Sequence, residues 1–275
     1  MNVHSFELTT VFDINAHFQN AEILTFDIGQ KEEILLHTRE DNAYYLYVFK
    51  AGELYHRLRI SMETCNFQFV DDTYILTLDS SDDTADVVYI NLQGEVLNTF
   101  PCGCTISGFR AMSLDEVWIG YADESVSDGY DYGLYCHNRR GEVVYHYEAP
   151  GGIIDCYSIN LSKNKIWVHH YADSGYYLAC VCAEIRQIKN YWHLKDNATV
   201  WGFTVSGRGV LFAGFNRRIE LQKIRLLDHH TFRKTYSSML NDGRQKLVNP
   251  VVKTRGDTFY FLEHGRIYKH VLPAS

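Results

Sequence analysis

Polar residues capable of acid–base chemistry fall on segments that we expect to be the innermost strand of each repeating sheet. Asp27 and Arg110 lie on two such segments. Asp155, Tyr157 and Asn160 lie on a third. Residues two apart on a strand point to the same side of a sheet, so Asp155 and Tyr157 would face the same way. They could form a polar pocket, and the alternative interpretation is that polar residues simply face a water-filled channel. These five residues are therefore candidates to line a polar channel.

Thiol pairs are the second group that could do chemistry. Cys102 and Cys104 have C-x-C spacing, as do Cys180 and Cys182. Zinc sites usually show C-x₂-C pairs together with a matching histidine spacing, which is missing here. The adjacent pair His169-His170 would point to opposite faces of a strand. We expect buried, inert thiols and no metal or other cofactor.

A calcium loop and a catalytic signature are not indicated. Residues 123–129 loosely resemble an EF-hand loop, but the glycine comes one place late and position 12 is Leu134 instead of Glu. The sequence contains no G-x-S-x-G, H-E-x-x-H or P-loop motif. Sialidase Asp boxes and the WD and kelch signatures are also missing. The sequence thus favours a binding role over an enzymatic one.

The elements that would position these residues come from a recurring hairpin. Its copies read YLYVFKAGELYHRL, VVYINLQGEVLNTF and GLYCHNRRGEVVYHY, with turn glycines at Gly52, Gly94 and Gly141. The glycines are separated by 42 and 47 residues. A strand-built period of this length is typical of a β-propeller.

The chain can be divided into repeats of four strands each. Complete repeats cover the ranges 21–60, 66–100, 105–148, 153–194 and 199–237. The tail, 247–272, supplies only three strands, and residues 3–12 form a spare strand. Pairing the spare strand beside the last repeat would remove an open edge. We therefore predict an all-β, six-bladed propeller of four-stranded antiparallel blades, closed by the N-terminal strand, with residues 1–275 as a single domain.

Composition restricts the partners and the compartment. The net charge of −8 argues against nucleic acid and anionic membranes, which both attract basic patches. The N-terminal MNVHSFELTT has neither the basic nor the apolar part of a secretion signal, and no run of 18 apolar residues occurs. Seven scattered cysteines are then expected to be reduced. We expect a cytoplasmic protein.

In a propeller the loops separate onto two faces, and their charges differ. We call the face with the second-to-third strand loops and the connections between blades the upper face. Its acidic residues are Glu40, Asp41, Asp82, Asp83, Asp123, Glu124, Asp128, Asp131, Asp173 and Asp196. The lower loops carry the basic residues Lys31, Lys50, Arg139, Arg140, Lys163, Lys165, Arg208 and Arg255. The sorting has exceptions: Arg217, Arg218, Arg244 and Lys246 are upper, whereas Asp71, Asp72, Asp115 and Asp257 are lower.

The longest upper loop, 121–133, is acidic and rich in tyrosine. An acidic face would steer a basic protein toward it, and tyrosines suit protein recognition. The predicted partner-binding residues are Asp123, Glu124, Asp128, Tyr130, Asp131 and Tyr132. A charged but ordinary solvated loop is the alternative interpretation.

Three segments resemble a group of uncharacterised bacterial propeller-like proteins. The group's W-x-G-Y-x-D-E, G-L-x-C-x-x-x-x-G and D-C-Y-x-x-N-x-x-x-x-x-x-W patterns match Trp118, Gly120, Tyr121, Asp123 and Glu124; Gly133, Leu134, Cys136 and Gly141; and Asp155, Cys156, Tyr157, Asn160 and Trp167. Ser125 stands where the group has glycine. The resemblance implies a propeller without an agreed activity. In size, charge and lack of catalytic residues such proteins are similar to immunity proteins that neutralise bacterial toxins, which is an analogy.

The sequence therefore predicts a non-enzymatic, protein-binding propeller, most concretely an immunity protein that binds and neutralises a basic bacterial toxin through its acidic loop face. The alternative is a hydrolase or lyase that acts on a small molecule or carbohydrate in the central channel.

Overall fold

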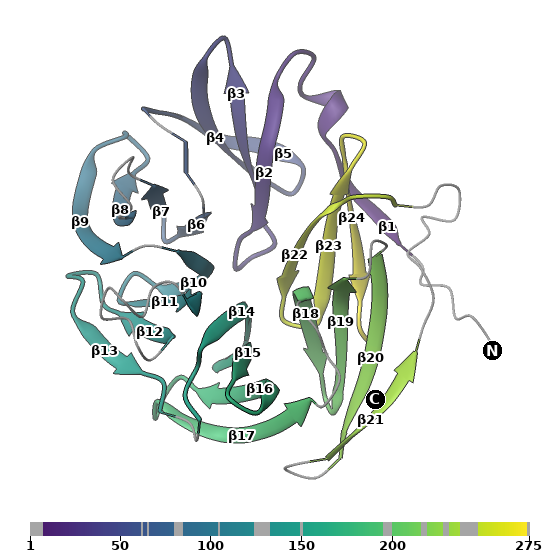
Figure 1. Ribbon diagram of the computed structural model, residues 1–275. Coiled ribbons are helices and arrows are strands. Elements are labelled where there is room, and N and C mark those ends of the chain that lie inside the picture. The colour runs from purple at the N-terminus through teal and green to yellow at the C-terminus, as the bar shows by residue number, and fades with distance from the viewer. Residues whose placement is uncertain are drawn as a thin grey trace. The chain divides into compact units, whose positions relative to one another are not determined.

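The described parts of the protein consist mainly of β-strands. The computed structural model describes residues 8–61, 63–64, 66–79, 85–103, 105–123, 133–148, 151–194, 200–215, 219–227, 231–236 and 247–273. The described strands form six sheets of four strands each (Figure 1). The 3-10 helix η1 spans Ile14–Ala16. No helix in the described parts is long and apolar enough to cross a membrane.

The chain divides into two compact units, Gln19–Cys156 and Met1–Phe18 with Tyr157–Ser275. We call them the first unit and the second unit. The first unit contains three sheets, each built from four consecutive strands. Their strands are β2 (Glu22–Ile28), β3 (Ile34–Glu40), β4 (Ala43–Lys50) and β5 (Glu53–Ile60); β6 (Asn66–Val70), β7 (Thr73–Asp79), β8 (Ala85–Asn91) and β9 (Val96–Gly103); and β10 (Ile106–Ser113), β11 (Glu116–Tyr121), β12 (Leu134–His137) and β13 (Val143–His146).

The second unit also contains three sheets. Two of them are again built from consecutive strands. These strands are β14 (Asp155–Ser162), in which the unit boundary falls, β15 (Lys165–Ala172), β16 (Gly175–Cys182) and β17 (Gln187–Leu194); and β18 (Val200–Ser206), β19 (Gly209–Phe215), β20 (Ile219–Leu227) and β21 (Thr231–Tyr236).

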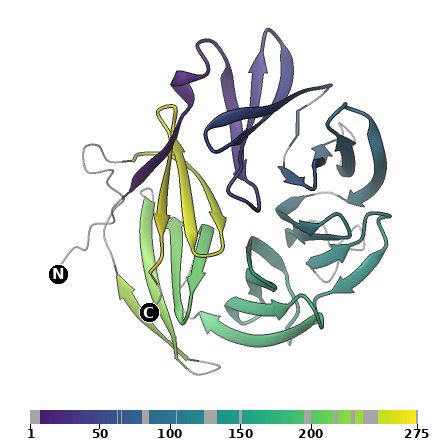
Figure 2. The same cartoon turned by 180° about the vertical axis from the view of Figure 1, so that it is seen from behind.

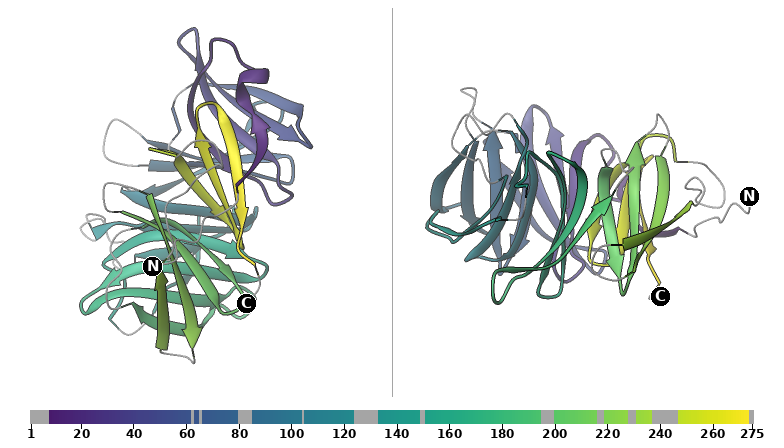
Figure 3. Two further views of the ribbon diagram at one scale, coloured as in Figure 1. Left: turned by 90° about the vertical axis from the view of Figure 1, so that its right-hand side faces the viewer. Right: turned by 60° about the horizontal axis from the view of Figure 1, so that its bottom comes forward.

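The third sheet of the second unit is assembled from both ends of the chain. Its strands are β1 (Thr9–Asp13), β24 (Arg266–Val271), β23 (Thr258–Glu263) and β22 (Val251–Arg255), in that order. β1 pairs antiparallel with β24, with Thr9 opposite Lys269 and Asp13 opposite Arg266. Seen from behind and from the side, the purple β1 lies along the yellow β24 (Figures 2 and 3).

These observations correct the predicted six-bladed ring closed by residues 3–12. Five sheets are complete blades of four consecutive strands, and the remaining sheet is a composite. Both partners in the pairing of β1 with β24 belong to the second unit, so the pairing completes a sheet without joining the two units. The strand begins at Thr9, and residues 3–7 lie outside the described ranges. A sequence repeat predicts where strands and turns occur. The packing of whole sheets depends on side-chain contacts that the repeat does not specify.

The recurring hairpin turn has a side-chain explanation. The Asn138 Oδ1 atom accepts hydrogen bonds from the backbone N–H groups of Arg140 and Glu142, at 2.9 and 3.1 Å. Its Nδ2 atom donates to the Glu142 carboxylate, at 2.7 Å. Asn91 makes the same set of bonds with Gln93 and Glu95. An asparagine therefore caps each of these turns from within.

The third turn glycine, Gly141, is required for two reasons. Its φ of +80° lies in the left-handed region that other residues avoid, and an added Cβ would lie 2.6 Å from Phe100. The glycine thus allows the turn between β12 and β13 to pack against β9 of the neighbouring sheet.

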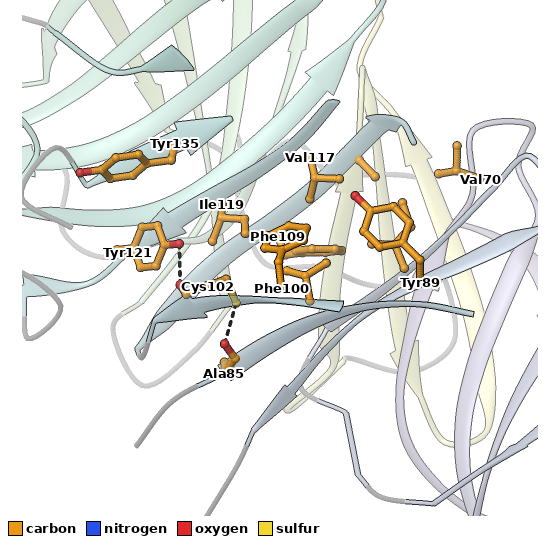
Figure 4. Packing of buried hydrophobic residues seen from close by; sticks show 13 residues of the cluster. Val70, Ala85, Tyr89, Phe100, Cys102, Phe109, Val117, Ile119, Tyr121 and Tyr135 are labelled. Atoms are coloured by element: carbon orange, nitrogen blue, oxygen red, sulfur yellow. Dashed lines mark hydrogen bonds between the residues drawn. The ribbon is translucent and has the colours of Figure 1, made fainter. Parts of the chain in front are cut away.

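Apolar side chains pack between neighbouring sheets of a unit. In the first unit, Phe100, Phe109 and Ile119 belong to one buried cluster (Figure 4). The Tyr121 hydroxyl donates to the Cys102 carbonyl, at 2.6 Å, and the Cys102 thiol donates to the Ala85 carbonyl, at 3.1 Å (Figure 4). The polar atoms within this apolar layer thereby acquire partners.

The described cysteines are free thiols. Cys102 and Cys180 are fully buried, and burial raises the pKa of the Cys180 thiol to about 11. Cys104 lies outside the described residues. Cys180 therefore stays protonated at neutral pH and packs as an apolar side chain.

Three histidines are fully buried: His37 on β3, and His169 and His170 on β15. The rings of His169 and His170 lie on opposite faces of their sheet, as predicted, since His169 packs on Phe212 and His170 on Tyr177. Burial lowers the pKa of His37 and of His170 to about 4. Burial and the neighbouring His170 lower the pKa of His169 to about 3.

These histidines should make the protein sensitive to acid. Between about pH 6.5 and pH 4 the unfolded chain binds protons that the folded chain does not, so the free energy of unfolding falls as the pH falls. Each histidine can contribute a loss of up to ~3 kcal/mol. Urea unfolding at pH 7.5, 6, 5 and 4.5 measures this slope. The slope should be smaller in His169→Phe, because this variant has one buried histidine fewer to bind a proton on unfolding. A His169→Phe slope equal to that of the unmodified protein would contradict the explanation.

Candidate functional site

The innermost strands of the first unit meet at one buried carboxylate. The Asp27 Oδ2 atom on β2 accepts a hydrogen bond from Gln68 Nε2 on β6, at 2.6 Å, and an ion-pair contact from Arg110 Nη1 on β10, at 3.3 Å. Its Oδ1 atom accepts from the backbone N–H of Ile28, at 2.7 Å. We call Asp27, Gln68 and Arg110 the Asp27 cluster. One side chain from each of the three sheets takes part in it.

The Asp27 cluster is shielded from solvent. The side chains of Asp27 and Arg110 are 7% and 11% exposed, and Gln68 is buried. Arg110 Nη1 also donates to the Phe109 carbonyl, at 2.8 Å, and Gln30 on the loop after β2 donates to the Ala111 and Met112 carbonyls on β10. The buried carboxylate thus accepts from an arginine and from two other donors. Its oxygens are occupied by protein groups, which suits a structural link better than a general base.

A second cluster occupies the corresponding place in the second unit. Asn160 on β14 is fully buried. Its Nδ2 atom donates to the carbonyls of Phe203 on β18 and of Gly256, each at 2.8 Å, and its Oδ1 atom accepts from the Gly256 N–H, at 2.8 Å. Gly256 lies in the turn between β22 and β23. We call Asn160 and these backbone groups the Asn160 cluster. It also joins three sheets through one side chain.

The remaining two channel candidates, Asp155 and Tyr157, belong to neither of these clusters. Asp155 and Tyr157 are partly exposed residues that alternate with buried ones along β14, so they share a face of the strand. The Tyr157 ring packs near His169 and Tyr176 of its own unit, with centroid distances of 5.7 and 5.9 Å. Tyr157 is thus part of an aromatic group on its sheet. Of the five predicted residues, the structure brings Asp27 and Arg110 together and places Asn160 in a separate cluster.

Sequence reasoning missed Gln68. The signal was present as a single polar residue within the apolar segment NFQFV, on the innermost strand of its repeat. A buried amide needs hydrogen-bond partners, so a polar residue at this position indicates a link to a neighbouring inner strand.

The predicted partner-binding loop is described at one of its six residues. Asp123 follows β11 and is exposed. Glu124, Asp128, Tyr130, Asp131 and Tyr132 lie outside the described residues, as do the upper-loop residues Asp82, Asp83 and Asp196. Their role in binding stays a prediction.

Four-stranded antiparallel blades held together at their inner strands define the β-propeller class of all-β proteins. The YxzG family matches residues 133–270, about half of the chain, and the protein belongs to this family. The match includes the second and third resemblance segments and leaves out the first, 116–126.

Solved structures with a similar fold share little sequence with this chain. A chain in the crystal structure of the mitotic checkpoint complex has a TM-score of 0.59 at 6% identity, over 94% of this chain and 76% of that one. A chain in the complex of KlAtg21 with the coiled-coil of AgAtg16 has a TM-score of 0.60 at 9% identity, over 91% and 81%. A chain of Kuenenia stuttgartiensis hydrazine synthase has a TM-score of 0.58 at 8% identity, over 89% and 75%. No curated protein matches the sequence. These likenesses show the fold alone.

The stability of the protein should depend on the side-chain amide of Asn160. Asn160→Ala leaves the Phe203 carbonyl and the Gly256 backbone groups without their partner, and each buried unsatisfied group costs about 1–3 kcal/mol. Asn160→Asp preserves the shape but cannot donate to two carbonyls and places a charge beside them. We expect both variants to lower the free energy of unfolding in urea, with Asp at least as harmful as Ala. An aspartate variant as stable as the unmodified protein would contradict the hydrogen-bonding account.

Proposed function

We propose that this protein acts by binding another protein and that its partner is basic. A β-propeller fold is consistent with a protein-binding role. The most concrete form of the proposal is an immunity protein that neutralises a bacterial toxin, in a bacterial and cytoplasmic setting. The inner-strand residues Asp27 and Asn160, which a channel enzyme would use, are engaged in holding sheets together. The proposed activity therefore lies on the surface.

Exposed carboxylates without an ion-pair partner on the upper loops carry the proposal. Two ion pairs neutralise part of the charge at the lower loops of the first unit, where the exposed carboxylates Glu53 and Asp71 form no ion pair with a described residue. Lys50 pairs with Asp72 at 3.7 Å, and Arg139 donates to the Asp115 carboxylate from Nε at 2.6 Å.

The upper loops contain carboxylates without such partners. Asp41, between β3 and β4, and Asp123, after β11, are exposed and form no ion pair with any described residue. Asp173, between β15 and β16 of the second unit, is exposed and unpaired in the same sense. Glu40 is the contrast, since Arg57 and Tyr47 contact it at 3.1 and 2.6 Å.

Exposed, unneutralised carboxylates on the upper loops suit an approaching cationic surface. Complementary charge accelerates encounter and selects partners, and its effect weakens as salt screens it. Blocking a basic, nuclease-like site requires this combination of charge and contact area, and the protein needs no catalytic group for it. The hydrolase or lyase alternative is not proposed, because no described feature favours it over binding.

The proposal can be tested with charge variants of the described loops. Capture from an extract of the native host on the immobilised protein, followed by mass spectrometry, should yield a basic protein. Asp41→Asn combined with Asp123→Asn should then weaken its binding about tenfold at low salt and flatten the salt dependence. Glu53→Gln, an exposed carboxylate at the lower end of the same unit, is the matched control.

A growth assay tests the immunity form separately. Expression of the captured protein alone should arrest a bacterial host, and co-expression with the unmodified chain should restore growth. A captured partner whose affinity is the same for the double variant and the control would overturn the acidic-face proposal. A harmless partner would overturn only the toxin-neutralising form.

A further inference from the structure

A pocket in the second unit combines indoles and cations. It has a volume of about 280 Å³ and is lined by Lys165, Trp167, Asn190, Trp192, Arg208 and Leu226. The residues come from β15, β17, the turn between β18 and β19, and β20. These strands are the green sheets of Figure 1. The pocket lies at the opposite end of the blades from Asp173, so it is separate from the proposed partner-binding face.

Strand register explains why these side chains converge. Lys165 and Trp167 are two apart on β15, and Asn190 and Trp192 are two apart on β17, so each pair shares a face. Trp167 and Asn190 lie opposite the same residue of the intervening strand, Cys180, which places the two pairs side by side.

The tryptophans make a rigid apolar floor. Their rings are stacked with a centroid distance of 5.7 Å and an interplanar angle of 13°. Trp167 is 6% exposed and Trp192 is 4% exposed, so both are fixed by the surrounding core. The turn that contains Arg208 is fixed to β20, because the Arg208 carbonyl accepts a hydrogen bond from the Leu226 N–H at 2.7 Å. A site on such fixed elements needs little ordering when a ligand binds.

The two cations at the pocket are not neutralised by the protein. Lys165 and Arg208 are exposed, and neither forms an ion pair with a described residue. In a chain of net charge −8, two unpaired cations that line one pocket form a local positive site. Arginine and lysine beside a pocket are the side chains that bind carboxylate and phosphate groups.

We propose that this pocket binds a small aromatic anion. The flat ring of the ligand would rest against the indoles, and its carboxylate or phosphate would lie between Lys165 and Arg208. The volume is near the lower end of the range for small-molecule sites, which limits the ligand to about one ring and its anionic group. All of the lining residues fall within the segment that matches the YxzG family. The proposal does not depend on the partner-binding function.

Titration calorimetry of the purified full chain tests the site with three ring-sized probes. Phenyl phosphate and benzoate carry the anion as phosphate and as carboxylate, and benzyl alcohol is neutral. We expect at least one anion to bind with a dissociation constant near 1 mM or below, and about tenfold more tightly than benzyl alcohol. The preferred anion identifies the ligand class. Inorganic phosphate should bind more weakly than phenyl phosphate, because it lacks the ring.

Charge variants assign that binding to this pocket. Lys165→Gln and Arg208→Gln change exposed side chains and leave the tryptophan core in place, and each should weaken binding of the preferred anion about tenfold. Lys163→Gln, an exposed lysine of the neighbouring turn that does not line the pocket, should leave it unchanged. Equal binding of the anions and benzyl alcohol, no binding of either anion, or unchanged binding in both pocket variants would overturn the proposal.

Discussion

The need to satisfy buried polar side chains on the inner strands is the constraint on which the rest of this structure depends. A carboxylate or amide removed from water must find partners, and the nearest ones belong to neighbouring sheets. Asp27 meets that need through Gln68 and Arg110. Asn160 meets it through the backbone groups of Phe203 and Gly256. Each unit is thereby joined at one inner point across its three sheets, while apolar clusters fill the space between the sheets farther out.

Because of this constraint, the inner polar residues are structural, and groups available for binding lie on the surface. Polar residues on inner strands are where a channel enzyme would keep its catalytic groups, and here two of them stabilise the fold. The charged side chains that form no ion pair within the described fold lie at its surface. In the first unit, Asp41 and Asp123 are exposed carboxylates on upper loops. In the second unit, Asp173 lies at one end of the blades, whereas Lys165 and Arg208 line a pocket with two indoles at the other end. The two proposed activities thus use different surfaces and opposite charges.

The sequence predicted the strands well, because the alternation of side chains and the hairpin glycines are local signals. Gly94 and Gly141 mark turns that Asn91 and Asn138 cap, so each turn could be located from a few neighbouring residues. The single closed ring could not be predicted in the same way, since packing of whole sheets is not local. Asp27 and Arg110 were named as separate channel candidates, and their contact, which joins residues 83 apart in the sequence, needed the structure. The Trp167–Trp192 stack was missed because no spacing in the sequence joins β15 to β17.

A double-mutant cycle between Asp27 and Arg110 tests the central claim most directly. The free energy of unfolding in urea would be measured for the unmodified protein, Asp27→Ala, Arg110→Ala and the double variant. If the buried pair links the sheets, the single variants lose stability that the double variant does not lose twice, with a coupling of about 1–3 kcal/mol. Additive losses, with a coupling below about 0.5 kcal/mol, would contradict the account.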